Sequence, residues 1–201
     1  MTAETPAPPM EPAEIAEAIV RAVRGVCDPE IPVLTIEDLG ILRSVEVVPA
    51  AEVAETAEAG ETAEVAETAG ASVPGVDDGL HAHVVITPTY SGCPAMETIR
   101  ADVQRAGRDA GADSVDVELV FSPAWTTDWM SEEAKAKLSE YGIAPPTGRA
   151  AAGPVGLSLA VKCPLCHSLN TAELSRFGST SCKALYRCND CLEPFDYFKV
   201  H

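Results

Sequence analysis

Four cysteines near the end of the sequence form two Cys-x-x-Cys pairs, Cys163 with Cys166 and Cys188 with Cys191. Each pair can turn two sulfurs toward one ion, and two pairs supply the four thiolates that a tetrahedral zinc ion takes. Twenty-one residues separate the two pairs, a distance that a small hairpin spans. The sequence therefore predicts a closed zinc site with four cysteine ligands. Because closed sites of this kind are structural, other chemistry has to come from another part of the chain or from a partner.

A second group of reactive side chains centres on Cys93 and Asp28. Cys93 is expected where a strand gives way to a helix, directly before Pro94 at the first helical position. Free N–H groups and the helix dipole stabilise a thiolate there, which predicts an accessible Cys93 thiol of low pKa. Asp28 lies in a proline-stiffened turn, residues 27–32, that can hold its carboxylate rigidly. A buried, inert thiol and a plain helix stop remain the alternatives for the two positions.

The pattern around the other candidate residues gives weaker indications of a chemical role. His81 and His83 share one face of a predicted strand without a third ligand, so we interpret them as a polar strand face. Cys182 is interpreted as a small buried side chain, with replacement of one paired cysteine as zinc ligand as the alternative. Three basic residues of the tail can offset the negative charge of a zinc tetrathiolate: Lys162, Lys183 and Arg187. The sequence contains no Gly-rich phosphate loop, Gly-x-Ser-x-Gly or His-Glu-x-x-His motif, so no complete enzyme active site is predicted.

The elements that would position these residues follow from hydrophobic periodicity. In chain order we expect a helix from Pro12, strands over 41–48 and 80–87, a helix after Pro94 and a strand over 115–121. The last strand, the helix before it and the strand before that helix form a βαβ unit, which is expected to be parallel. The predicted fold class is α+β, with an αββαβ domain followed by a small zinc-ribbon-like module.

Composition sets the expected boundaries of these parts. The predicted segments are a disordered N-terminus, a first domain, a linker and a cysteine module: residues 1–11, 12–143, 144–158 and 159–201. Within the first domain, residues 49–76 contain a Glu-rich hexapeptide repeat. Its period of three gives no stable apolar helix face, so we expect a flexible acidic insertion at the tip of a hairpin.

Charge and cysteine content exclude several classes of protein. The net charge of −17 opposes binding to nucleic acid or to an anionic membrane, since both require a positive surface. The sequence shows no signal peptide and no run of about 20 apolar residues. Seven cysteines, with two Cys-x-x-Cys pairs, are typical of reduced thiols and metal ligands. We therefore expect a cytoplasmic protein without nucleic-acid or membrane partners.

Three motifs in chain order resemble the SufT-like family of iron–sulfur cluster assembly proteins: Asp28–Pro32 (DPEIP), Asp38–Leu42 (DLGIL) and Thr87–Pro94 (TPTYSGCP). This resemblance covers residues 12 to about 122. The continuation, Pro123–Trp129 (PAWTTDW), and the ending, Phe177–Phe198, are similar to the D-subunit family of the bacterial phenylacetyl-CoA epoxidase system. Together the two resemblances cover nearly the whole chain. The Glu-rich insertion departs from the family pattern.

The resemblance implies an accessory, non-catalytic subunit in aerobic phenylacetate breakdown. In that system a di-iron oxygenase subunit carries out the chemistry, and a flavin and iron–sulfur reductase subunit supplies the electrons. The D subunit then assists metal-centre assembly, with the reductase's cluster as the expected target. The implied partners are those two subunits and the iron–sulfur assembly machinery. The implied cofactors are a structural zinc ion and a transient iron–sulfur cluster, handled by Cys93 and Asp28.

Two other functions remain open from the sequence. A zinc ribbon can belong to a nucleic-acid or transcription adaptor, but residues 160–201 hold five basic and four acidic residues and form no basic stripe. A thiol redox enzyme using Cys93 is the other alternative. That interpretation lacks a Cys-x-x-Cys partner at Cys93, so Cys27 would have to act as the resolving thiol.

Overall fold

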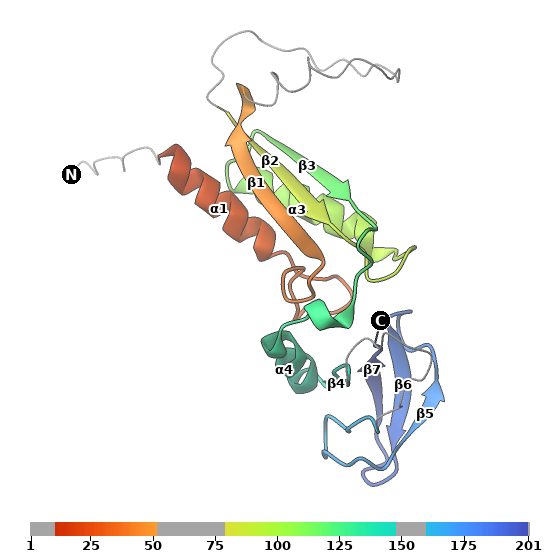
Figure 1. Ribbon diagram of the computed structural model, residues 1–201. Coiled ribbons are helices and arrows are strands. Elements are labelled where there is room, and N and C mark those ends of the chain that lie inside the picture. Colours follow the sequence, from red (N-terminus) through yellow and green to blue (C-terminus); the bar gives the residue numbers. More distant parts are fainter. Residues whose placement is uncertain (1–10, 52–78, 148–159, 201) are drawn as a thin grey trace, which may run out of the picture.

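The computed structural model describes residues 11–51, 79–147 and 160–200. Figure 1 shows two lobes, a larger one with helices packed on a sheet and a smaller one built from short strands. The expected disordered N-terminus and acidic insertion lie almost entirely outside the described residues, as does most of the expected linker.

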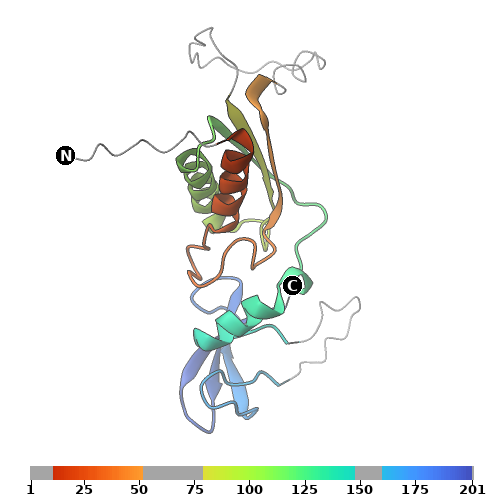
Figure 2. The same cartoon turned by 90° about the vertical axis from the view of Figure 1, so that its left-hand side faces the viewer.

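The larger lobe has the predicted αββαβ order. Its elements are α1 (Pro12–Arg24), β1 (Leu42–Pro49), β2 (Leu80–Ile86), α3 (Ala95–Asp109) and β3 (Ser114–Leu119). The strands lie in the order β1-β2-β3, with β1 antiparallel to β2 and β3 parallel to it, as the βαβ pattern predicted. Both helices cover the same face of the sheet (Figure 2). Within the described segments, no helix is both long and apolar enough to cross a membrane.

The core of this lobe lies between the two helices and the covered sheet face. It is built from fully buried aliphatic residues at helical and strand spacing, including Ile19, Val23, Val84, Ile86, Ile99 and Val103. Each such side chain contributes about 1.5–3 kcal/mol when it leaves water. The opposite sheet face is polar: His81 Nδ1 lies 2.8 Å from Ser114 Oγ, and His83 Nε2 lies 3.3 Å from Glu118. The two histidines are thus part of a polar strand face, as expected.

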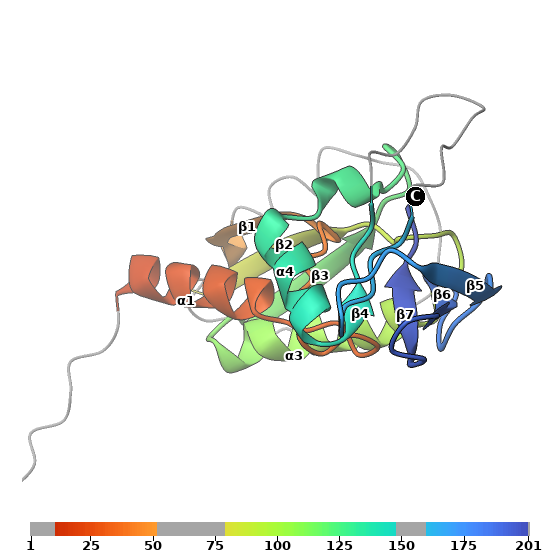
Figure 3. The same cartoon turned by 90° about the horizontal axis from the view of Figure 1, so that it is seen from below.

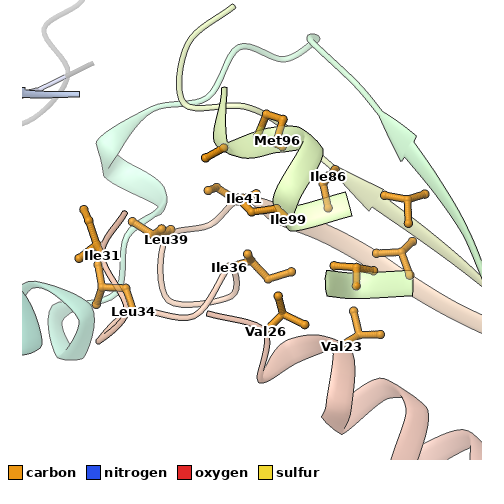
Figure 4. Packing of buried hydrophobic residues seen from close by; sticks show 14 of the residues in the cluster. Val23, Val26, Ile31, Leu34, Ile36, Leu39, Ile41, Ile86, Met96 and Ile99 are labelled. Atoms are coloured by element: carbon orange, nitrogen blue, oxygen red, sulfur yellow. The ribbon is translucent and has the colours of Figure 1, made fainter. Parts of the chain in front are cut away.

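The segment between α1 and β1 is a compact loop with its own buried side chains, among them Ile31, Leu34 and Leu39 (Figure 4). The indole Nε1 of Trp125 donates to the Leu39 carbonyl oxygen at 2.9 Å. Gly40 has φ +69°, and a Cβ at this position would lie 2.7 Å from the Trp129 Cβ. Glycine is therefore required at this position for both its conformation and its size.

A short connection leads to the smaller lobe. It consists of the 3-10 turn η1 (Thr127–Trp129) and the helix α4 (Glu132–Glu140), whose N-cap Ser131 accepts from the Ala134 N–H at 3.0 Å. The smaller sheet contains β4 (Ile143–Ala144), β5 (Thr171–Ser175), β6 (Lys183–Cys188) and β7 (Pro194–Phe198). The strand order is β4-β7-β6-β5. Figure 3 shows α4 beside this sheet.

The two lobes share buried side chains. Cys182 and Phe198, both from the tail, belong to the same buried cluster as the core of the first lobe. The Phe198 ring meets the Trp125 ring edge-on, with centroids 6.2 Å apart. Because these contacts remove apolar surface of both lobes from water, the ribbon is packed onto the first lobe and not merely tethered to it.

Candidate functional site

The four paired cysteines converge at one end of the smaller sheet. All four sulfurs lie within 4.8 Å of one another. The Cys163 and Cys191 sulfurs are 3.8 Å apart, and those of Cys166 and Cys188 are 3.5 Å apart. Four sulfurs placed tetrahedrally at ~2.3 Å from a zinc ion would be ~3.8 Å from one another. The spacing therefore fits a zinc ion and is too long for disulfide bonds.

The backbone is folded to present these sulfurs. The residue after each pair, His167 and Leu192, has a positive φ, 64° and 68° respectively. The chain thus makes a tight knuckle around each pair. Backbone N–H groups of Cys191 and Asp190 donate to the Cys188 sulfur and lower its pKa to about 7. The neighbouring sulfurs raise the pKa values of Cys191 and Cys166 above the ordinary value, so a divalent ion that binds here has to displace protons from these thiols.

Polar side chains connect the two knuckles. Asp190 accepts from the Ser168 hydroxyl and, at 2.8 Å, from the Asn170 side-chain amide. The Asn189 amide donates to Asn170 Oδ1 at 3.0 Å. These residues fix the mutual position of the two pairs, as hydrogen bonds around metal ligands commonly do. Sequence reasoning missed these residues because no motif or regular spacing marks them.

Asp28 is buried, with 7% of its surface exposed. Its Oδ1 accepts from the backbone N–H groups of Glu30 and Ile31, both at 2.8 Å. Burial raises the pKa of the Asp28 carboxyl above its ordinary value, although these two hydrogen bonds and the Lys183 ammonium oppose the shift. The turn thus holds a carboxylate whose negative charge is poorly solvated.

Cys93 lies directly before Pro94, the N-cap of α3, and is half-buried. The expectation of a low-pKa thiol at this position is wrong. Burial raises its pKa, and the carboxylates of Glu30 and Asp28 add to the shift, while the Ala95 N–H and the Tyr90 hydroxyl oppose it. The helix start contributes as predicted, but desolvation and two nearby negative charges outweigh it. Cys93 is therefore a neutral thiol near neutral pH.

Asp28 and Cys93 are brought into electrostatic contact across about 65 residues of sequence, and Glu30 and Tyr90 join them. Sequence reasoning selected the first two as site residues and did not select Glu30 or Tyr90. Cys27, next to Asp28, is exposed and lies close enough to Lys137 of α4 to interact with it electrostatically. Among the described residues, the groups that act on the Cys93 thiol do not include Cys27. This arrangement gives no support to Cys27 as a resolving thiol.

Residues of the ribbon also lie near the site around Cys93 and Asp28. The Tyr90 hydroxyl is within hydrogen-bonding reach of both Cys93 and Ser181. The negative charges of Glu30 and Asp28 act on the Cys182 thiol, as they act on the Cys93 thiol. Lys183 was expected to offset charge at the zinc site, but it is 4% exposed and acts on Asp28 and Glu30 instead.

The buried charge of Asp28 predicts a measurable pH effect. A carboxyl with a raised folded-state pKa stabilises the fold fully in acid, and that contribution is lost as pH rises through the folded pKa. Asp28→Asn keeps an Oδ1 acceptor for the two N–H groups and removes the charge. We expect equal thermal stability of the two proteins near pH 4 and a higher Tm for the variant near pH 7. A variant that matches the parent near pH 4 but is less stable than it near pH 7 would show that the charge stabilises the fold.

These features define a class of protein, namely an αββαβ domain of the iron–sulfur-assembly type that carries a C-terminal zinc ribbon. Residues 149–199 match the family model described as the PaaD zinc beta ribbon domain. Over 172 residues the chain is 44% identical to a protein of Escherichia coli (strain K12) that is provisionally named as the D subunit of 1,2-phenylacetyl-CoA epoxidase. The match covers 86% of this chain and 85% of that relative. The chain belongs to the family of 1,2-phenylacetyl-CoA epoxidase D subunits.

Two further comparisons concern the first lobe. The chain is 35% identical over 123 residues to an Fe-S protein maturation auxiliary factor of Porphyromonas gingivalis (strain ATCC BAA-308 / W83), covering 61% of this chain and 89% of that protein. A crystal structure of the domain of unknown function DUF59 from Bacillus anthracis covers 62% of this chain and 91% of its own. Its sequence identity is 21% and its TM-score is 0.42, a likeness too weak to support any inference.

Proposed function

We propose that this chain is a non-catalytic accessory subunit that assists assembly of an iron–sulfur cluster in the phenylacetyl-CoA epoxidase system. The observation that carries the proposal is the group formed by Cys93, Asp28, Glu30 and Tyr90. A soft thiol beside two carboxylates is suited to iron, and the same positions lie in the motifs that resemble assembly proteins. The names of the relatives, an epoxidase subunit and a maturation factor, point to the same role.

The protonation state of Cys93 suggests how a cluster is taken up and released. A neutral thiol binds iron weakly, because the thiolate is the ligand. When iron approaches, its positive charge favours loss of the thiol proton, which the nearby Asp28 or Glu30 carboxylate can accept. Return of that proton to the sulfur weakens the bond and favours transfer to a client. Such a ligand holds its cargo transiently, as an assembly factor requires.

The four ribbon cysteines have a different role in this proposal. They hold a structural zinc ion that fixes the two knuckles and, through β6 and β7, keeps Cys182 and Phe198 packed on the first lobe. A closed tetrathiolate site offers no open position for a substrate. Iron–sulfur chemistry is therefore assigned to the Cys93 region and zinc to the ribbon.

The test is the iron–sulfur content of the reductase subunit, isolated from cells with and without this chain. A maturation role predicts that the reductase protein is made in normal amount without the chain but carries markedly less iron and acid-labile sulfide. A fully loaded reductase in cells lacking the chain would exclude the role. In that case the chain would be better described as a scaffold for the oxygenase components.

A further inference from the structure

A small cavity lies on one face of the ribbon sheet and belongs to neither of the two sites described above. Its volume is about 270 Å³, and its floor is formed by Ala184 and Tyr186 of β6 and Tyr197 of β7. Ala184 pairs with Tyr197 across the two strands, so both side chains point to the same face. The Tyr186 and Tyr197 rings meet edge-on with centroids 5.4 Å apart, which gives the cavity an ordered aromatic floor.

Phe177 lies at the rim of this cavity. At 66% exposure it is the most exposed large apolar side chain among the described residues. Its backbone N–H donates to the Ser175 hydroxyl at 3.2 Å, and the Lys199 ammonium lies 4.8 Å from the centre of its ring. The same ammonium donates to the Arg176 carbonyl oxygen at 3.2 Å. The ring is thus ordered although it buries little surface, and an ordered side chain loses little conformational freedom when a partner covers it.

The rim is positively charged in a strongly acidic chain. Arg176 and Lys199 supply two cations to the lining of the cavity, and Glu173 supplies one carboxylate. That carboxylate accepts from the Tyr186 hydroxyl at 3.3 Å, and the Arg176 side chain beside it is 88% exposed. Because the whole chain carries a net charge of −17, an acidic partner is repelled by most of its surface and attracted at this rim. Such a contrast fixes where and in which orientation a partner docks.

The size of the cavity decides which kind of occupant fits. Small-molecule sites usually have volumes of ~300 to ~1,000 Å³ and enclose most of their ligand. A cavity of about 270 Å³ with an exposed aromatic rim instead holds one large side chain. Aromatic and Arg residues are also the side chains that contribute most to protein–protein contacts. These features fit a protein segment that inserts an aromatic or branched aliphatic side chain and carries carboxylates on either side of it.

We propose that the surface formed by Phe177, Arg176, Lys199 and the cavity beside them docks the client protein. The segment of the client that binds here is acidic and has one large apolar anchor side chain. This inference rests on the proposed function, because it takes the client to be the subunit whose cluster the chain helps to assemble. It extends that function by giving the ribbon a role in recognising the client.

The docking surface lies close to the junction of the two lobes. The Gly178 N–H, directly after Phe177, donates to the Lys183 carbonyl oxygen at 2.8 Å. The neighbouring Cys182 is buried in the core of the first lobe. The connection from β5 to β6, which carries these residues, lies next to the first lobe in both Figure 1 and Figure 2. A client that binds here is therefore held beside the lobe that contains Cys93.

The experiment measures binding of the purified reductase subunit to the full-length, zinc-loaded chain by isothermal titration calorimetry at low and high salt. Phe177→Ala and Arg176→Glu should each weaken the affinity by at least about tenfold. The parent should bind more weakly as salt rises, and Arg176→Glu should depend less on salt. Phe121→Ala is the matched control, because Phe121 is 58% exposed but belongs to the first lobe. It should bind like the parent.

A photo-cross-link identifies the occupant directly and does not depend on a loss of affinity. Phe177→p-benzoylphenylalanine keeps an aromatic group at the rim and reacts on irradiation with whatever covers it. In a mixture with the reductase, it should attach to an acidic segment of the reductase that contains a large apolar residue. Attachment to a second copy of this chain, to residues 148–159 of the same chain, or to a segment without acidic residues would overturn the inference.

The binding results are separate from the test of the proposed function. Parent affinity in both Phe177→Ala and Arg176→Glu, or an equal loss in Phe121→Ala, would overturn docking at this surface and leave the proposed function standing. Failure of the reductase to bind the parent chain would also overturn the inference alone. The proposed function fails on a different observation, a reductase that carries its full cluster in cells lacking this chain.

Discussion

Cys93→Ser is expected to reduce phenylacetyl-CoA epoxidation in cells by at least about tenfold, while the protein folds and keeps its zinc. Serine has nearly the size of cysteine, and its hydroxyl can still hydrogen-bond to Tyr90, so the half-buried site should tolerate it. A hydroxyl remains un-ionised near neutral pH and is a hard ligand, so it binds iron of a cluster poorly. The measurement is the epoxidation rate, or growth on phenylacetate, in cells whose only copy of this chain is the variant.

The control for this experiment is Cys27→Ser. Cys27 neighbours Asp28 in the sequence but is exposed, and it is not among the groups that act on the Cys93 thiol. It should support epoxidation at the parent rate. If Cys93→Ser does so as well at equal protein level, Cys93 has no part in cluster handling. Equal losses in both variants would instead point to a general effect of cysteine replacement.

Cys188→Ser is expected to have the largest effect on stability. Cys188 is fully buried, ends β6 and supplies one of four sulfurs. Structural zinc contributes on the order of 10 kcal/mol to folding of small modules, and three ligands retain only part of that. We expect zinc to fall below about half an equivalent and the Tm to fall by at least about 10 °C.

The loss of zinc in Cys188→Ser should also affect the first lobe. Trp125 is 6% exposed and packs against Phe198 of the ribbon. When the ribbon unfolds, this indole becomes accessible to water, so its fluorescence should shift to longer wavelength together with zinc release. Zinc content and Tm at the parent level in Cys188→Ser would contradict a structural site with four cysteine ligands. Zinc loss without any change in fluorescence would show that the contact between the lobes does not depend on the metal.

The elements of this fold were predictable because each follows from a short stretch of sequence. The apolar spacing of Ile19 and Val23 gives α1, and alternation in β2 gives the covered sheet face. The four-cysteine site was predictable for the same reason, since each half is a four-residue motif. Local spacing thus indicated the order of the helices and strands and the four candidate metal ligands.

The environment of Cys93 was not predictable in the same way. The sequence shows the helix start beside it, which lowers a thiol pKa, but not the burial or the carboxylates that raise it. Those carboxylates come from Asp28 and Glu30, more than sixty residues earlier. The interaction of the Tyr90 hydroxyl with Ser181 joins segments about ninety residues apart. Such contacts depend on how the lobes pack, and no periodicity in the chain encodes them.

The role of this chain in cluster assembly is tested most directly by the iron and acid-labile sulfide content of the reductase subunit. The reductase should be isolated from three strains that differ only in this chain: parent, chain deleted, and Cys93→Ser. We predict a loaded reductase in the first and a largely cluster-free reductase, present in equal amount, in the other two. A reductase that carries its full cluster in the strain without the chain would contradict an assembly role.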